Sequence, residues 1–159
     1  MTEKNEQFMR VALKEAQKAY KHGEVPVGAV IVYNDAVVSQ AYNRPIHLKD
    51  PTAHAEILAI RKACRKVGNY RLIDAVLYTT LEPCIMCAGA ILQARIKHVV
   101  YGAEDPKNGA VESLYQLFND KRFNHTVEIT GGVLKESCAE ILHRFFWEKR
   151  IISRSASTG

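Results

Sequence analysis

Residues 75–103 read AVLYTTLEPCIMCAGAILQARIKHVVYGA, and this stretch decides the fold class. Its first six residues, 75–80, predict a buried strand because they are mostly apolar, β-branched or aromatic. Pro83 is tolerated at the first position of a helix, and we expect that helix to run to about Ala94. Residues 99–103 predict a second strand. A strand, a helix and a strand in succession are typical of an α/β protein with a largely parallel sheet.

The rest of the chain extends this pattern on both sides. Apolar residues recur at helical spacing over residues 8–20, which predicts an amphipathic first helix. Residues 27–33 predict a strand, and the turn signal Asn34-Asp35 leads to a return strand at 36–41. The remaining predicted elements are a loop at 43–50, a helix at 51–67, a loop at 104–109, a short helix at 113–118, a strand at 127–130 and a helix at 136–150.

Together these elements predict a three-layer α/β/α fold, in which a five-stranded mixed sheet carries helices on both faces. A length of 159 residues suits a single domain. We assign residues 1–152 to that domain. Residues 153–159 are polar and are expected to form a disordered C-terminal tail.

The composition excludes several classes of protein. With 47% apolar and 25% charged residues, the chain is not a disordered one. No apolar run approaches the roughly 20 residues of a membrane span, and no signal-peptide core follows the polar N-terminus. We therefore expect a cytoplasmic protein with reduced thiols and no membrane contact. The net charge of +5 is compatible with a polyanionic partner.

Two of the predicted helices begin beside residues that can bind a metal. His54 lies at the start of one helix, and Cys84 and Cys87 lie at the start of the other. A three-residue spacing puts both sulfurs on one helix face, and a helix N-terminus favours the thiolate. One imidazole and two thiolates favour zinc, and three protein ligands with an open fourth position are typical of a catalytic site.

Glu56 follows two residues after His54, and we interpret it as the catalytic base. In the first turn of a helix, the two side chains can converge. Zinc lowers the pKa of a bound water from 15.7 to about 7. A carboxylate within hydrogen-bond reach of that water can take its proton, which would complete a hydrolytic site.

Other interpretations of these residues stay open at this point. The Cys84/Cys87 pair could be a redox pair, although a redox pair has no need of a distant His-Ala-Glu triplet. The two cysteines could also be core thiols, and His54 alone could be an ordinary histidine. The combination of all four residues favours the metal site.

The motif His54-x-Glu56 with Pro83-Cys84-x-x-Cys87 is the signature of the zinc nucleobase deaminases. Beyond it, the chain resembles the bacterial tRNA-specific adenosine deaminases over roughly residues 6–150. The stretches that carry the resemblance are EVPVGA (24–29), NR (43–44), DPTAHAE (50–56), NYRL (69–72), TLEPCIMCAGA (80–90), YGA (101–103) and NH (124–125).

The resemblance implies a cytidine deaminase-like fold, a homodimer, one Zn2+ per subunit and no organic cofactor. It implies hydrolytic deamination of adenosine to inosine at the wobble position of a tRNA anticodon loop. In that mechanism zinc-bound hydroxide attacks C6 of adenine. Glu56 acts as the proton shuttle, first to N1 and then to the departing ammonia.

The resemblance also implies a set of substrate contacts. Asn43 matches the asparagine that reads the base, and the backbone of Ala55 would face the base. The positions that contact RNA in the family fall on Asp105, Lys107, Asn124 and Phe145. From spacing alone, Asn43 could instead cap a loop and Phe145 could belong to the core.

Basic clusters at 62–66, 121–122 and 149–154 could contact RNA phosphates or could simply be solvated faces. The family's C-terminal helix is often more basic, whereas Trp147-Glu148 precedes Lys149-Arg150 here.

Two rival functions remain. One is deamination of a free base or nucleoside such as cytosine, cytidine or guanine. The other is a zinc-stabilised RNA-binding module without catalysis, which would have no need of Glu56.

Overall fold

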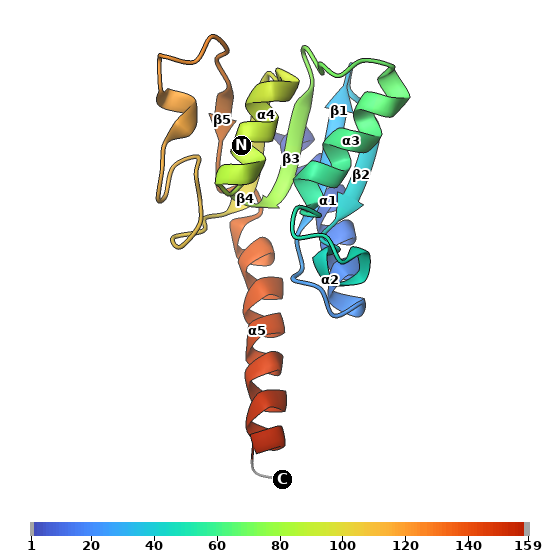
Figure 1. Ribbon diagram of the computed structural model, residues 1–159, viewed down its shortest axis with the longest axis vertical. Coiled ribbons are helices and arrows are strands. Elements are labelled where there is room, and N and C mark those ends of the chain that lie inside the picture. Colours follow the sequence, from blue (N-terminus) through green and yellow to red (C-terminus); the bar gives the residue numbers. More distant parts are fainter. Residues whose placement is uncertain (1, 158–159) are drawn as a thin grey trace.

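Within residues 2–157, which this computed structural model describes, five strands form one mixed sheet in the order β2-β1-β3-β4-β5 (Figure 1). The strands are β1 (Gly28–Tyr33), β2 (Ala36–Tyr42), β3 (Val76–Leu81), β4 (His98–Ala103) and β5 (Glu128–Thr130). β1 pairs antiparallel with both β2 and β3, while β3–β4 and β4–β5 pair in parallel. The predicted mixed sheet, parallel after the hairpin, is confirmed.

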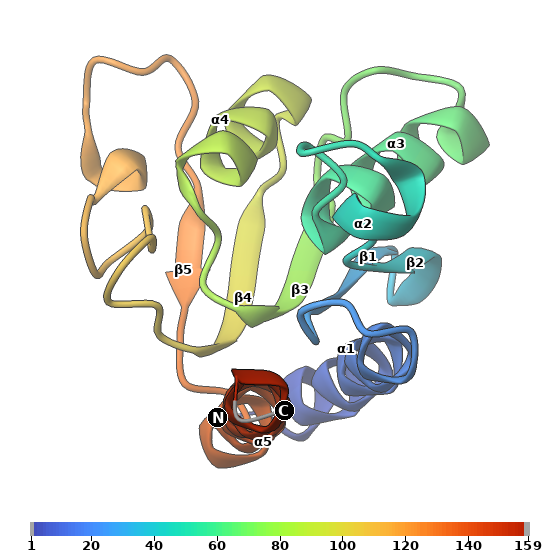
Figure 2. The same cartoon turned by 60° about the horizontal axis from the view of Figure 1, so that its bottom comes forward.

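Helices cover both faces of the sheet, as Figure 2 shows. The helices α1 (Glu3–Lys21) and α5 (Lys135–Ser157) lie on one face, and α3 (Ala55–Val67) and α4 (Ile85–Ala94) lie on the other. A one-turn helix, α2 (Pro45–Leu48), precedes α3, and a 3-10 turn, η1 (Leu117–Asn119), precedes β5. This is the predicted three-layer arrangement.

Alternation along the strands divides the core between the two faces, because successive side chains point to opposite sides of a sheet. Ile31, Leu77 and Val99 pack in the cluster under α3 and α4. Their neighbours Val30 and Val100 pack in the cluster under α1 and α5. Both faces of the central strands are buried, which explains why these strands read as continuous apolar runs rather than alternating ones.

The predicted hairpin turn is confirmed, and the close packing of α1 also has an identifiable cause. Asn34 and Asp35 both have positive φ, 50° and 61°, as a two-residue hairpin turn requires. Gly28 lets α1 lie directly on β1, since a Cβ there would collide with the backbone of Ala12. The close packing of α1 on the sheet therefore depends on a residue without a side chain.

Two predicted helices differ from the structure. The helix expected from residue 51 begins only at Ala55, because the Asp50 carboxylate accepts bonds from the amide and hydroxyl of Thr52 and holds a turn there. The short helix expected at 113–118 is mostly a turn, and only η1 is helical. The amides of Val111, Glu112 and Ser113, before and at its expected start, donate to the side chain of Glu82.

The C-terminal prediction is wrong for residues 153–157. These residues continue α5, which extends well beyond the sheet (Figure 1). Once a helix has formed, each further residue adds a hydrogen bond at little cost, and Arg, Ala and Ser allow this. Residues 158–159 of the expected tail lie outside the described part of the chain. None of the helices in the described part is both long and apolar enough to span a membrane.

Candidate active site

The three predicted metal ligands come together where two helices begin. His54 is the N-cap of α3, Cys84 is the N-cap of α4, and Cys87 lies in the first turn of α4. Their ligand atoms all lie within 4.8 Å of one another. Because the positive ends of both helices point at this place, the site favours thiolates.

The spacing of these atoms fits a zinc ion. The Nδ1 atom of His54 lies 3.6 Å from the sulfur of Cys84 and 3.5 Å from the sulfur of Cys87. Zinc with its usual Zn–N and Zn–S bond lengths and tetrahedral angles separates nitrogen from sulfur by about 3.6 Å. The donor set and its geometry therefore suit the metal, with a fourth position left for water or substrate.

The two thiols share one proton. The hydrogen bond from Cys87, with help from His54, lowers the pKa of Cys84 to about 4. The same contact holds the proton on Cys87, whose pKa is raised. The environment thus favours the thiolate of Cys84, and a metal would replace the proton between the two sulfurs.

Glu56 lies in the first turn of α3 and is only 4% exposed. Burial raises the pKa of Glu56 to about 7 and outweighs the hydrogen bonds from its own backbone amide and the Cys87 thiol, which lower it. A carboxyl group with a pKa near neutrality can both take and return a proton at physiological pH.

A cavity of about 1150 Å³ opens beside these residues. His54, Glu56 and Cys84 line it, as does Asn43. A volume above the usual range of about 300–1,000 Å³ for small-ligand pockets leaves room for more than one base.

Asn43 and Ala55 are joined to each other. The side-chain oxygen of Asn43 accepts the amide proton of Ala55 at 2.7 Å, so Asn43 helps to cap α3. Ala55 is fully buried, and its N–H is already engaged. Asn43 lines the cavity, and the bond to Ala55 does not use its side-chain NH2 group.

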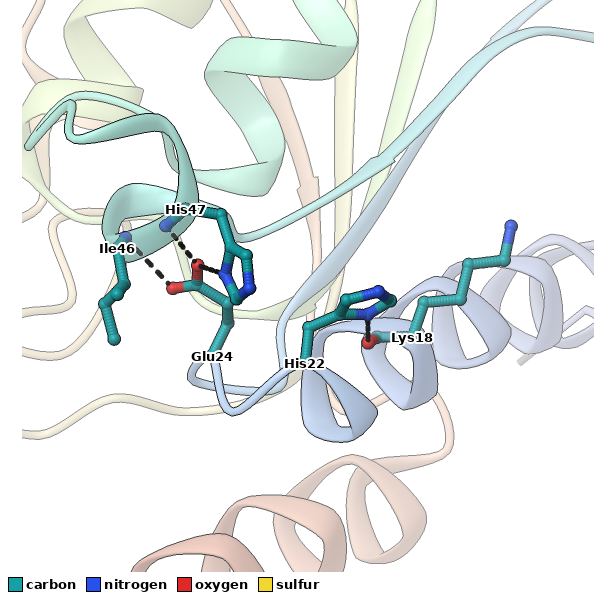
Figure 3. A network of polar contacts seen from close by, with 5 residues as sticks. All are labelled: Lys18, His22, Glu24, Ile46 and His47. Carbon is teal, nitrogen blue, oxygen red and sulfur yellow. Dashed lines mark hydrogen bonds and ion pairs between the residues drawn. The ribbon is translucent and has the colours of Figure 1, made fainter.

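Glu24 fixes the segment that carries Asn43, and sequence reasoning assigned it no role. Figure 3 shows its carboxylate beside α2, where it accepts the main-chain amides of Ile46 (3.2 Å) and His47 (2.9 Å). The Nδ1 atom of His47 contacts the same carboxylate at 2.6 Å. Burial alone would raise the pKa of Glu24, but the hydrogen bonds from His47 and Ile46 outweigh it and lower the pKa.

The predicted RNA contacts divide into two groups. Asp105 and Lys107 line the cavity, in the segment after β4. Asn124 is exposed in the segment between η1 and β5, away from the cavity-lining residues. Phe145 is 7% exposed and packs edge-on against Tyr20 in the core, so the structure does not bring it into the cavity.

α5 supplies a wall of the cavity that sequence reasoning missed. The residues of α5 that line the cavity are Leu142, His143, Phe146, Lys149, Arg150 and Ser153. They follow the three- and four-residue spacing of one helix face, which could have indicated a common side. The neighbour of Phe145, Phe146, is thus the aromatic residue at the cavity. Of the three basic clusters, only 149–154 contributes to its lining.

Comparison with known proteins agrees with this geometry. The family model for the cytidine and deoxycytidylate deaminase zinc-binding region matches residues 2–103. A tRNA-specific adenosine deaminase of Haemophilus influenzae is 50% identical over 151 residues, which cover 94% of this chain and 87% of the relative. The chain belongs to this family of zinc-dependent deaminases.

Solved structures show the same fold. A structure from studies of A-to-I editing by tRNA:A34 deaminases at the wobble position of transfer RNA is 48% identical. The match has a TM-score of 0.83 and covers 86% of this chain and 99% of that chain. A guanine deaminase from Bacillus subtilis is 38% identical with a TM-score of 0.61, covering 80% of this chain and 83% of that one. Deaminases of this fold therefore act on more than one kind of substrate.

Proposed function

We infer that this chain deaminates adenosine to inosine at the wobble position of a tRNA anticodon. The observation that carries the inference is a buried carboxyl group, Glu56, with a pKa raised to about 7, beside a His/Cys/Cys metal site in a cavity of about 1150 Å³. The similarity to tRNA-specific adenosine deaminases favours adenosine in RNA over other deaminase substrates. This substrate would place the reaction in the cytoplasm.

We propose that His54, Cys84 and Cys87 hold one zinc ion per subunit. Bound zinc would supply a water acidic enough to attack a purine carbon at neutral pH. The Glu56 carboxylate would accept a proton and deliver it to N1 of adenine, which would lower the barrier to addition at C6. Glu56 would then pass the remaining proton of the added hydroxyl group to the exocyclic amino group, which leaves as ammonia while the carbonyl of inosine forms.

Asn43 would read the base. Its oxygen is engaged by Ala55, and its amide nitrogen can donate to a purine acceptor. Because Glu24 anchors the neighbouring residues, this donor is held in place before substrate binds. The Ala55 backbone would contribute through its carbonyl or its position, since its N–H already serves Asn43.

RNA outside the reacting base would contact the segments that extend from the cavity. Asp105 and Lys107 lie at its edge, and Lys149 and Arg150 of α5 can meet phosphates. Phe146, which is 45% exposed and lines the cavity, would make the RNA contact that the resemblance implied for Phe145, by stacking on a base. Asn124 would serve only if the RNA extends beyond the cavity.

We propose that α4 forms a homodimer interface. Apart from Gln93, the sequence of this helix, IMCAGAILQA, is made of apolar residues and glycine, and helices of that kind are normally buried. Yet Ile85 is 56% exposed, and Gly89 has no atom near the place where a Cβ would stand. A second copy packed there would cover this face. Light scattering of an Ile85→Glu variant would then show a monomer, whereas a wild-type monomer would refute the interface.

The substrate can be tested directly. Zinc-loaded protein is incubated with an anticodon stem-loop that bears a wobble adenosine and, separately, with free adenosine, cytidine and guanine. Mass spectrometry follows the product in each case. We expect inosine in the stem-loop alone. Deamination only of guanine or of another free base or nucleoside would keep the zinc chemistry and overturn the RNA substrate. Stem-loop binding without any deamination would favour the noncatalytic RNA-binding module.

A further inference from the structure

Glu82 is a second buried carboxylate near the metal site, at the junction between β3 and Pro83. Its side chain is 2% exposed. Five donors from one segment converge on it: the main-chain amides of Asp105 (3.1 Å), Val111 (3.1 Å), Glu112 (2.8 Å) and Ser113 (2.9 Å), and the hydroxyl of Ser113. Glu82 thus binds both ends of the segment 105–113, which we call the 105–113 loop.

The 105–113 loop is built around this carboxylate. A Cβ on Gly109 would stand against the carboxylate, so the loop closes on Glu82 only because Gly109 has no side chain. The amide of Ala110 donates to the carbonyl of Pro83 at 2.9 Å, and Gly109 pairs with Cys84 as an isolated β-bridge. The loop is therefore attached directly to the turn that carries a metal ligand.

The same loop forms part of the cavity. Asp105, Lys107 and Asn108 all line the cavity. The Asp105 carboxylate accepts the amides of Lys107 and Asn108, each at 3.2 Å. A chain of contacts thus runs from Glu82 through Asp105 to the cavity-lining residues.

Glu82 has no capacity left for proton transfer. Its Oε1 atom accepts two hydrogen bonds and its Oε2 atom accepts three. Burial alone would raise the pKa of Glu82, but the bonds from Ser113, Glu112 and Asp105 outweigh it, and the pKa is lowered. The group stays a carboxylate and acts through the residues that it holds.

We propose that Glu82 is a positioning residue, which sets the 105–113 loop in the place where the loop recognises RNA beyond the reacting base. The inference rests on the proposed RNA substrate. Loop contacts of this kind exist both before and during the chemical step. Their loss should therefore raise KM and leave kcat nearly unchanged.

A Glu82→Gln variant separates the two ends of the loop. The glutamine oxygen should take the place of Oε2, which accepts hydrogen bonds from the three amides at 111–113, because an NH2 group cannot accept hydrogen bonds. The NH2 group then faces Asp105 and Ser113. The Ser113 hydroxyl can rotate to accept a hydrogen bond, but the Asp105 amide cannot. The variant should release the Asp105 end of the loop and leave the other end in place.

The experiment compares the zinc-loaded wild type, Glu82→Gln and a control, Glu6→Gln, which removes the same charge from the exposed face of α1. Steady-state deamination of the stem-loop, zinc content and amide hydrogen exchange are measured for each. For Glu82→Gln we expect unchanged zinc content, faster exchange confined to residues 105–108, a KM raised about tenfold and a kcat within about twofold. Glu6→Gln should match the wild type.

Two results would overturn the proposal. An unchanged KM despite faster exchange would show that the position of the loop does not matter for RNA. A lower kcat with loss of zinc would show that Glu82 supports the metal turn instead. If Glu82→Gln does not fold, Ser113→Ala removes a single donor and should raise KM about twofold to threefold; an unchanged KM in that folded variant would contradict the proposal. Wild-type turnover of the stem-loop tests the RNA substrate separately.

Discussion

Glu56 and Glu82 are the same residue type at nearly the same burial, 4% and 2% exposed, yet their environments make them opposites. Glu82 accepts five hydrogen bonds, and its pKa is lowered. Glu56 has fewer donors, its own backbone amide and the Cys87 thiol, and burial outweighs them and raises its pKa to about 7. Burial alone therefore does not decide what a carboxylate does, because the number of N–H and O–H groups aimed at it determines the sign of the shift.

The comparison of Glu56 with Glu82 shows that the buried carboxyl groups around the site have two different tasks. Glu24 and Glu82 hold two cavity-lining segments, one with Asn43 and one with Asp105, by accepting main-chain amides. Glu56 lies next to His54 and Cys84, and its raised pKa suits a group that must take up and release a proton there. Glu24 and Glu82 use their hydrogen bonds to hold the walls of the cavity in place, whereas Glu56 is available for chemistry.

Removing a metal ligand should affect activity and stability more than changing any of these carboxylates. We expect Cys87→Ala to lose zinc, to lose deamination entirely and to melt at a lower temperature, because metal-binding energy at such a site is folding energy. Elemental analysis and thermal melts measure both changes. Full zinc occupancy in the variant would show that Cys87 is not a ligand.

Glu82→Gln should destabilise the protein by about 2 kcal/mol at pH 7, since it removes a charged acceptor and leaves an amide unpaired. The folded-state pKa of Glu82 lies below its ordinary value of 4.5. Its stabilising effect is therefore complete above that value and is lost as the pH falls through the lower, folded pKa. The difference in denaturant unfolding between wild type and variant should shrink toward pH 3. A difference independent of pH would mean that the charge of Glu82 is not what matters.

Glu56→Gln should stabilise the metal-free protein at high pH, whereas Glu82→Gln destabilises the protein. Because the folded pKa of Glu56 is raised from 4.5 to about 7, the metal-free wild type loses stability as the pH rises through this range. We expect the metal-free variant to be more stable than the metal-free wild type by roughly 1–3 kcal/mol at pH 8 and equal to it near pH 4. Lower stability of the variant at pH 8 would remove the contrast with Glu82.

His47 offers the smallest test. Its ring contacts Glu24, but its side chain is 44% exposed, and the two main-chain amides remain when the ring is removed. His47→Ala should cost no more than about 0.5 kcal/mol. If His47→Ala lowered the free energy of unfolding by several times this amount, the ring rather than the two amides would anchor the segment that carries Asn43.

Local patterns in the sequence predicted much of this molecule. The order of elements, the hairpin turn at Asn34-Asp35 and the grouping of His54, Cys84 and Cys87 follow from spacing and turn chemistry. Glu24 and Glu82 could not be recognised, because their partners lie more than 20 residues away in the chain. The positions of Phe145 in the core and of Phe146 at the cavity could not be predicted for a similar reason. Adjacent helical residues differ by about 100° in direction, and only the packing of α5 on α1 decides which one faces the core.

The most direct test of the account is the rate of inosine formation in the stem-loop under single-turnover conditions with saturating, zinc-loaded enzyme. Glu56→Gln should lose about 10³-fold or more in rate, because proton transfer to and from the substrate is lost. Glu82→Gln should keep the rate within about twofold once RNA is bound. Equal losses in the two variants, or a wild-type rate in Glu56→Gln, would contradict the division between a proton carrier and a positioning residue.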